Sequence, residues 1–131
     1  MIVDSSVWID YFGHLRTPAA QRVLQHLQKG LPIFLMDVIY QEVLQGAKSA
    51  QEFVTLQADL DRLPLVPMED THELHRQAAM LYARCKWKGI TIRSPNDCLI
   101  AACALESGLP VLSLDRDFQM MARIEPKLKL V

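Results

Sequence analysis

The stretch Met1–Ser6, which reads MIVDSS, decides the fold because an apolar run ends at an acid and passes directly into helix-starting hydroxyls. The run Met1–Val3 predicts a short buried strand. Ser5 or Ser6 can then cap a helix, since a side-chain oxygen at this position accepts a hydrogen bond from a free backbone N–H. The chain therefore opens with a strand, an acidic junction at Asp4 and a helix.

The same alternation of strand and helix continues along the chain. The next apolar runs predict strands at Pro32–Met36, Leu65–Val66, Val111–Leu114 and Leu128–Val131. Cap residues and apolar spacing predict helices over Thr17–Gly30, Asp37–Gly46, Ser49–Leu63, Asp70–Lys88, Asn96–Ser107 and Asp117–Arg123. Strands that alternate with helices favour an α/β sandwich, in which a central and mostly parallel β-sheet is flanked by helices.

Length and composition favour one globular domain over residues 1–131. The formal net charge is −1, so the chain lacks the positive charge with which a protein coats nucleic acid nonspecifically. Its three cysteines form no C-x-x-C pair, which argues against a disulfide framework and favours a reducing, cytoplasmic location. We expect no targeting signal at the amino terminus, and no apolar run reaches the ~18 residues that a membrane span needs.

Acidic residues recur where the predicted parallel strands end. Asp4 follows the first strand and Asp115 the fourth, with Asp117 two residues later. Glu42 lies early in the helix after the second strand, and Asp97 lies in the first turn of the helix that leads into the fourth. Because functional groups gather at the carboxyl ends of parallel strands, all five side chains can point into one crevice.

Each acid also has a purely structural interpretation. Asp97 can belong to a capping box that begins at Ser94. Asp4 and Asp115 can cap helices, and Glu42 can be a solvated helix residue. Taken together, the carboxylates instead indicate a cation site, because packed like charges repel one another unless a cation lies among them. Hard oxygen ligands favour Mg²⁺ or Mn²⁺, and two such ions about 4 Å apart can promote phosphodiester hydrolysis.

The basic residues are concentrated in one segment, in which Trp87 lies between them: Arg84, Lys86, Lys88 and Arg93. These cations can hold phosphates while Trp87 stacks on a base, as in proteins that bind single-stranded nucleic acid. The alternative is a solvated helix end, where cations are favoured by the helix dipole. Arg93 is the best candidate for a substrate contact because it lies four residues before Asp97.

Four segments along the chain are informative together: Ile2–Asp10 (IVDSSVWID), Glu42–Gly46 (EVLQG), Ser94–Ala102 (SPNDCLIAA) and Ser113–Phe118 (SLDRDF). In this order and at these separations, they resemble a PIN-domain ribonuclease, specifically the VapC-type toxin of a type II toxin–antitoxin system. Ser113 departs from the threonine that the family often has there, but it keeps the hydroxyl.

The resemblance implies metal ligands at Asp4, Glu42, Asp97 and Asp115, and accessory residues at Ser6, which would form hydrogen bonds within the site, and Asp117. It also implies Mg²⁺- or Mn²⁺-dependent endonucleolytic cleavage of RNA, a homodimer, and a VapB-type antitoxin that covers or enters the active site. It leaves open which RNA is cut, whether one or two ions act, and whether Asp115 or Asp117 is the main fourth acid.

Three other functions match parts of the pattern. Haloacid-dehalogenase-like phosphatases have a second Asp two residues after a strand-end Asp, but here that position is Ser6. A receiver domain would need a Lys after a late strand, and the nearest base, Arg116, is misplaced for that role. The third is a non-catalytic PIN-like scaffold that binds RNA or protein, against which the acid at every ligand position argues.

Overall fold

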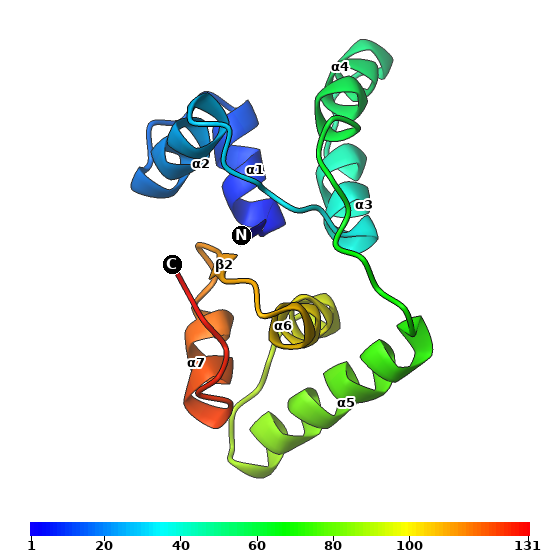
Figure 1. Cartoon of the computed structure of the whole chain (residues 1–131), viewed down its shortest axis with the longest axis vertical. Coiled ribbons are helices and arrows are strands. Elements are labelled where there is room, and N and C mark those ends of the chain that lie inside the picture. Colours follow the sequence, from blue (N-terminus) through cyan, green and yellow to red (C-terminus); the bar gives the residue numbers. More distant parts are fainter.

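The computed structural model describes residues 1–131, and it has an α/β architecture in which a short parallel sheet lies between two groups of helices (Figure 1). In chain order the elements are β1 (Ile2–Val3), α1 (Ser5–Phe12), α2 (Pro18–Gln28), α3 (Asp37–Gln45), α4 (Ala50–Leu60), α5 (Thr71–Trp87), α6 (Pro95–Ser107), β2 (Val111–Leu112) and α7 (Arg116–Ile124). The predicted fold class is confirmed.

The sheet is centred on β1. This strand pairs in parallel with β2, with Ile2 opposite Val111 and Val3 opposite Leu112. Single parallel bridges extend the pairing on both sides and link Ile2 to Phe34, Leu35 to Leu65, and Val111 to Leu130. The order of the segments across the sheet is therefore marked by residues 65, 35, 2, 111 and 130. The first strand of the sequence is central in this order.

The predicted strands are in the right places, but their predicted lengths are wrong. Regular pairing is confined to two residues in each of β1 and β2. The segments Pro32–Met36, Leu65–Val66 and Leu128–Val131 contribute isolated bridges only. Proline explains part of this, because Pro64 and Pro67 bound the second of these segments and proline has no N–H to donate to a neighbouring strand.

The helices cover the sheet on two sides (Figure 1). On one side α1 packs against α2 and α3, and α3 packs against α4. On the other side α5, α6 and α7 pack against one another. The uncharged middle of α6 is buried between its neighbours, as its composition predicts. No helix combines the length and the apolar character that would be needed to cross a membrane.

Three helix starts differ from the predictions. The N-cap of α1 is Asp4, whose carboxylate accepts a hydrogen bond from the Ser6 N–H, so neither Ser5 nor Ser6 is the cap. Asp37 is the first residue of α3 and not its cap. Ser94 does occupy the N-cap position of α6, but its hydroxyl makes no capping hydrogen bond, so the predicted capping box is absent. At α1 the acid at the strand end displaces the hydroxyls because it directly precedes the first helical residue.

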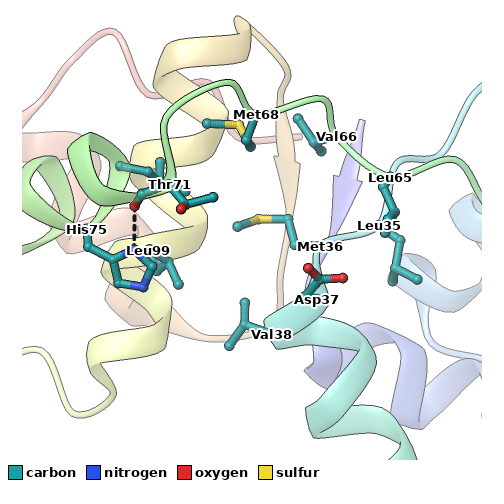
Figure 2. A pocket seen from close by; sticks show the side chains of 11 residues that line it. Leu35, Met36, Asp37, Val38, Leu65, Val66, Met68, Thr71, His75 and Leu99 are labelled. Carbon is teal, nitrogen blue, oxygen red and sulfur yellow. Dashed lines mark hydrogen bonds between the residues drawn. The ribbon is translucent and has the colours of Figure 1, made fainter.

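A pocket of about 240 Å³ lies between the Leu65 edge of the sheet, the start of α3 and the first turns of α5 (Figure 2). Its lining is mainly apolar, and none of the five acids singled out above belongs to it. His75 lines the pocket, and its Nδ1 donates a hydrogen bond of 2.6 Å to the carbonyl oxygen of Thr71 in its own helix. The pocket is therefore separate from the acidic edge of the sheet.

Candidate active site

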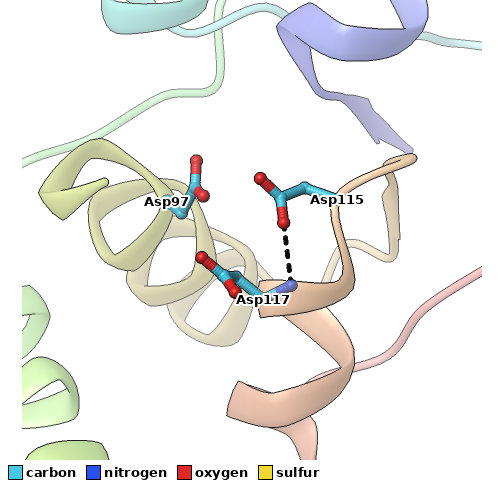
Figure 3. Close-up of side chains that lie close together, drawn as sticks. All are labelled: Asp97, Asp115 and Asp117. Carbon is cyan, nitrogen blue, oxygen red and sulfur yellow. Dashed lines mark hydrogen bonds between the residues drawn. The ribbon is translucent and has the colours of Figure 1, made fainter. Parts of the chain in front are cut away.

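Three acids converge where α6 and α7 begin. Asp97 lies in the first turn of α6, Asp115 is the N-cap of α7, and Asp117 lies in the first turn of α7. One carboxylate oxygen from each lies within 4.8 Å of the other two. Figure 3 shows the three side chains approaching one another from the two helices. The convergence arises because both helices start at the same edge of the sheet.

Asp97 is the least satisfied of these acids. The residue is only 6% exposed, and its Oδ2 atom is buried without any hydrogen-bond partner. Burial, and after it the negative charges of Asp4, Asp115, Glu42 and Asp117, together raise the pKa of Asp97 from 3.8 to about 7. The other four acids thus all raise the pKa of Asp97, and Asp97 forms no ion pair with a basic residue.

Asp4 is in the opposite condition. Its Oδ2 accepts hydrogen bonds from the Ser6 hydroxyl at 2.6 Å, the Ser113 hydroxyl at 2.9 Å and the Ser6 N–H at 3.3 Å. The two hydroxyls are held in turn, because Ser6 Oγ accepts from the Leu114 N–H and Ser113 Oγ accepts from the Asp115 N–H. The three hydrogen bonds to Asp4 all end on Oδ2, which fixes the carboxylate and leaves Oδ1 free.

Arg93 neutralises the outer pair of acids. Its Nη2 donates to Asp115 Oδ1 at 2.7 Å and its Nε donates to Asp117 Oδ2 at 3.3 Å. The Arg93 backbone N–H also donates to Asp117 Oδ2, at 3.0 Å. The hydrogen bond that Arg93 donates to Asp117, together with the charges of both acids, raises the pKa of Arg93. The side chain is 61% exposed, so it covers Asp115 and Asp117 from the solvent side while Asp97 remains unpaired.

Glu42 is oriented by a neighbour that the sequence did not single out. The Asn96 side-chain amide donates a hydrogen bond of 3.0 Å to Glu42 Oε1. This bond links the middle of α3 to the first turn of α6. The signal for Asn96 in the sequence was its place directly before Asp97, but the partner across 54 residues could not be read from spacing.

The donor set suits a hard divalent cation. The side chains that converge offer carboxylate oxygens, and neither His nor an accessible Cys is among them, because Cys98 is buried in α6. Oxygen ligands of this kind favour Mg²⁺ or Mn²⁺ over softer metals. The buried and unpaired Asp97 Oδ2 is the atom that such a cation would satisfy. The residues at this site therefore fit Mg²⁺ or Mn²⁺.

Comparisons with known proteins show what the chain is similar to. The family model described as PIN domain matches residues 1–124. The chain is 34% identical over 125 residues to VapC ribonuclease Mb1587 of Mycobacterium bovis and to ribonuclease VapC11 of Mycobacterium tuberculosis, covering 95% of this chain and 92% of each relative. It also matches the crystal structure of VapBC2 from Rickettsia felis bound to a DNA fragment from their promoter, with a TM-score of 0.73 and 21% identity over 99% of this chain and 96% of that chain.

Proposed function

The chain belongs to the PIN-domain family, with VapC ribonucleases among its relatives, and we propose that it is an endoribonuclease toxin that hydrolyses RNA phosphodiester bonds and is neutralised by a VapB-type antitoxin. The observation that carries the proposal is the convergence of the Asp97, Asp115 and Asp117 carboxylates, of which Asp97 has an oxygen buried without a hydrogen-bond partner. We further propose that it acts in the cytoplasm as a homodimer. The free thiols of its three buried cysteines are compatible with that location.

The proposed site would hold Mg²⁺ or Mn²⁺ through Asp4, Glu42, Asp97 and Asp115, with Asp117 as an accessory residue. When bound, the cation supplies positive charge that polarises a phosphoryl oxygen and lowers the pKa of water. The protein's own contribution is orientation. The Ser6 and Ser113 hydroxyls hold Asp4, and Asn96 holds Glu42, so these carboxylates are already fixed before a cation arrives.

Arg93 is the proposed substrate contact. Its guanidinium lies over Asp115 and Asp117 and is largely exposed, so a phosphate that approaches the acids from solvent meets Arg93 first. A guanidinium offers paired N–H donors that match phosphate oxygens. Cleavage by the proposed reaction would leave a 5′-phosphate and a 3′-hydroxyl, as the family resemblance implies.

The test is to map new RNA 5′ ends after purified protein is mixed with total cellular RNA. We expect discrete new ends with Mn²⁺, none with EDTA, and none with the near-isosteric Asp97→Asn variant. Glu69→Gln is the matched control, because Glu69 is an exposed acid outside the site, and it should cut as the wild type does. Ends that persist in Asp97→Asn would contradict the site.

The non-catalytic scaffold gives a different pair of results. No new ends would appear in any sample, and Mn²⁺ would not raise the melting temperature of the protein. A melting temperature that rises with Mn²⁺ in the wild type but not in Asp97→Asn supports the cation site independently of cleavage. The two readouts together separate an inactive scaffold from a nuclease whose RNA target was missing from the sample.

A further inference from the structure

Trp87, the last residue of α5, is unusually exposed for its type. It is 72% exposed, the highest value among the large apolar side chains of the protein, whereas the other tryptophan, Trp8, is 1% exposed. A single exposed apolar residue is common on protein surfaces and carries no meaning alone. What distinguishes Trp87 is the chemistry of its neighbours.

The lysines on either side of Trp87 are cations without acidic partners. Lys86 and Lys88 are both exposed, and neither takes part in an ion pair. Arg84, one turn earlier, behaves differently, since it donates to Glu125 at 3.1 Å and to the Ile124 carbonyl oxygen at 2.9 Å. The helix dipole accounts for cations at the end of α5, but it does not account for an exposed indole that lies between two of them in the sequence.

A short and well-fixed segment joins Trp87 to the acids. α5 ends in a turn. In this turn the N–H groups of Lys88 and Ile90 donate hydrogen bonds of 3.0 and 2.9 Å to the Cys85 carbonyl oxygen. Ile92 is buried, and Arg93 then binds Asp115 and Asp117. Arg93 lies six positions after Trp87, so the Cα atoms of the two residues are at most about 21 Å apart even if the chain were fully extended. A nucleic-acid strand at the acids can reach Trp87 within a few nucleotides.

From this arrangement we propose that Lys86, Trp87 and Lys88, termed the Trp87 platform, bind single-stranded RNA. A base stacks on the Trp87 indole, and the two lysines hold the phosphates on either side of that nucleotide. Stacking tolerates any base, because every base has a π-face, so the platform supplies affinity and not sequence choice. This assignment rests on the proposed function, which supplies RNA as the ligand. It places the RNA strand that leaves the cleavage site along residues 88–93.

The test uses the intrinsic fluorescence of Trp87. A single-stranded oligoadenylate of about eight nucleotides is titrated into Asp97→Asn protein in EDTA, so that no RNA is cut. We expect quenching of the exposed Trp87, while the emission of buried Trp8 persists and reports an intact fold. Trp87→Ala, made in the same background, should lose the quenching and bind about tenfold more weakly, as judged by the anisotropy of a labelled oligonucleotide.

Matched variants separate stacking from general apolar contact. Trp87→Phe should recover most of the affinity and Trp87→Leu should not, because only phenylalanine offers a π-face. Val54→Ala is the control, since Val54 is also exposed but lies on α4, and it should bind as its parent does. Equal affinity in Trp87→Leu and Trp87→Phe would overturn the stacking assignment.

The lysines are tested through the dependence of affinity on salt. Lys86→Gln and Lys88→Gln should each lower the slope of log Kd against log salt concentration by about 0.7, as expected for one phosphate contact with a single strand. Lys29→Gln, at the exposed end of α2, should leave the slope unchanged. Slopes equal to the parent's in both platform variants would overturn the role of the lysines.

The outcomes distinguish this proposal from the proposed function. Unaltered Trp87 emission and unaltered affinity in Trp87→Ala would overturn the platform, whatever the cleavage assay gives. Normal quenching in a protein that cuts no RNA would leave the platform standing and count against the nuclease. A Trp87 emission that shifts with protein concentration before RNA is added would assign the surface to self-association and overturn RNA binding there.

Discussion

The starts of α1 and α6 differ in how the acidic side chain beside each of them is hydrogen-bonded. Each helix begins beside an acid at the same edge of the sheet. At α1 the carboxylate of Asp4 caps the helix and accepts hydrogen bonds from two serine hydroxyls. At α6 the Ser94 hydroxyl makes no cap, and Asp97 keeps a buried oxygen without a donor.

The Asp4 carboxylate therefore stabilises the fold, whereas the Asp97 carboxylate destabilises it. A hydrogen-bonded cap stabilises the protein, whereas a buried and unpaired carboxylate beside other acids destabilises it until a cation or a proton arrives. The contrast teaches that position at a strand end does not fix the role of an acid. The donors that surround each carboxylate decide it.

The largest effect should come from removing the charge of Asp97. The folded protein holds this proton up to about pH 7, while the unfolded chain releases it near its ordinary value of 3.8. The folded state is therefore penalised progressively as the pH rises from about 4 to 7, and the penalty stays above that range. In EDTA at pH 8, Asp97→Asn should be more stable than the wild type by on the order of 1–3 kcal/mol, and the two should agree closely near pH 4.

Urea unfolding at both pH values measures this difference. An equal or lower unfolding free energy for Asp97→Asn at pH 8 would break the contrast, because Asp97 would then be stabilised by something other than a cation. Asp61→Asn is a useful comparison, since Asp61 is an exposed acid at the end of α4. It should show no such gain.

The next effect should be a loss of stability in Asp4→Ala. The variant removes the N-cap of α1 and the acceptor shared by Ser6 and Ser113, so we expect the unfolding free energy to fall by about 2 kcal/mol. Asp70→Ala is the matched control, because Asp70 caps α5 through one exposed bond of 2.9 Å, and it should lose about 1 kcal/mol. Urea titration near pH 5 gives both values, and equal losses would mean that the serine network adds nothing.

Arg93→Gln sharpens the comparison from the side of the outer acids. Removing the guanidinium frees Asp115 and Asp117 from a competing cation, so Mn²⁺ should bind roughly fivefold more tightly, a gain of about 1 kcal/mol. Isothermal titration calorimetry measures the affinity, and Arg62→Gln, an exposed arginine that pairs with Asp59, serves as the control. Weaker binding in Arg93→Gln would show that Arg93 positions the acids for the ion instead of competing with it.

The smallest effect is expected at Asn96. Asn96→Ala removes the hydrogen bond that orients Glu42, and Mn²⁺ affinity should fall about two- to threefold. Gln45→Ala, at an exposed position of the same helix as Glu42, should leave the affinity unchanged. An unchanged Mn²⁺ affinity in Asn96→Ala would show that the hydrogen bond from Asn96 is not needed to orient Glu42 for the ion.

The order of strands and helices was predictable from the sequence because apolar runs and caps are local signals. Strand length was not, since pairing at Leu35 and Leu65 depends on register between distant segments and on the prolines that bound them. The same division holds at the helix starts. The sequence offers Asp4, Ser5 and Ser6 as caps for the first helix, and only the geometry at Ser6 shows that Asp4 is the one that caps it.

At the candidate site, the sequence identified which acids could meet because all follow from one topological rule. It could not assign their partners. The position of Arg93 four residues before Asp97 predicts a substrate contact, but it does not predict the pairing of Arg93 with Asp115 and Asp117, 22 and 24 residues away. That Asp97 lacks a donor is a property of the folded surroundings, and no pattern of neighbours along the chain encodes it.

The hydrogen bond between Asp4 and Ser113 spans 109 residues and has a consequence for biosynthesis. β1 is made long before its neighbour β2 and the acids at positions 97, 115 and 117. A chain still growing on the ribosome has Asp4 exposed and nothing to assemble it with. The acidic cluster therefore forms only after the chain as far as Asp117 has emerged, and a translation product that stops before Ser113 cannot form it.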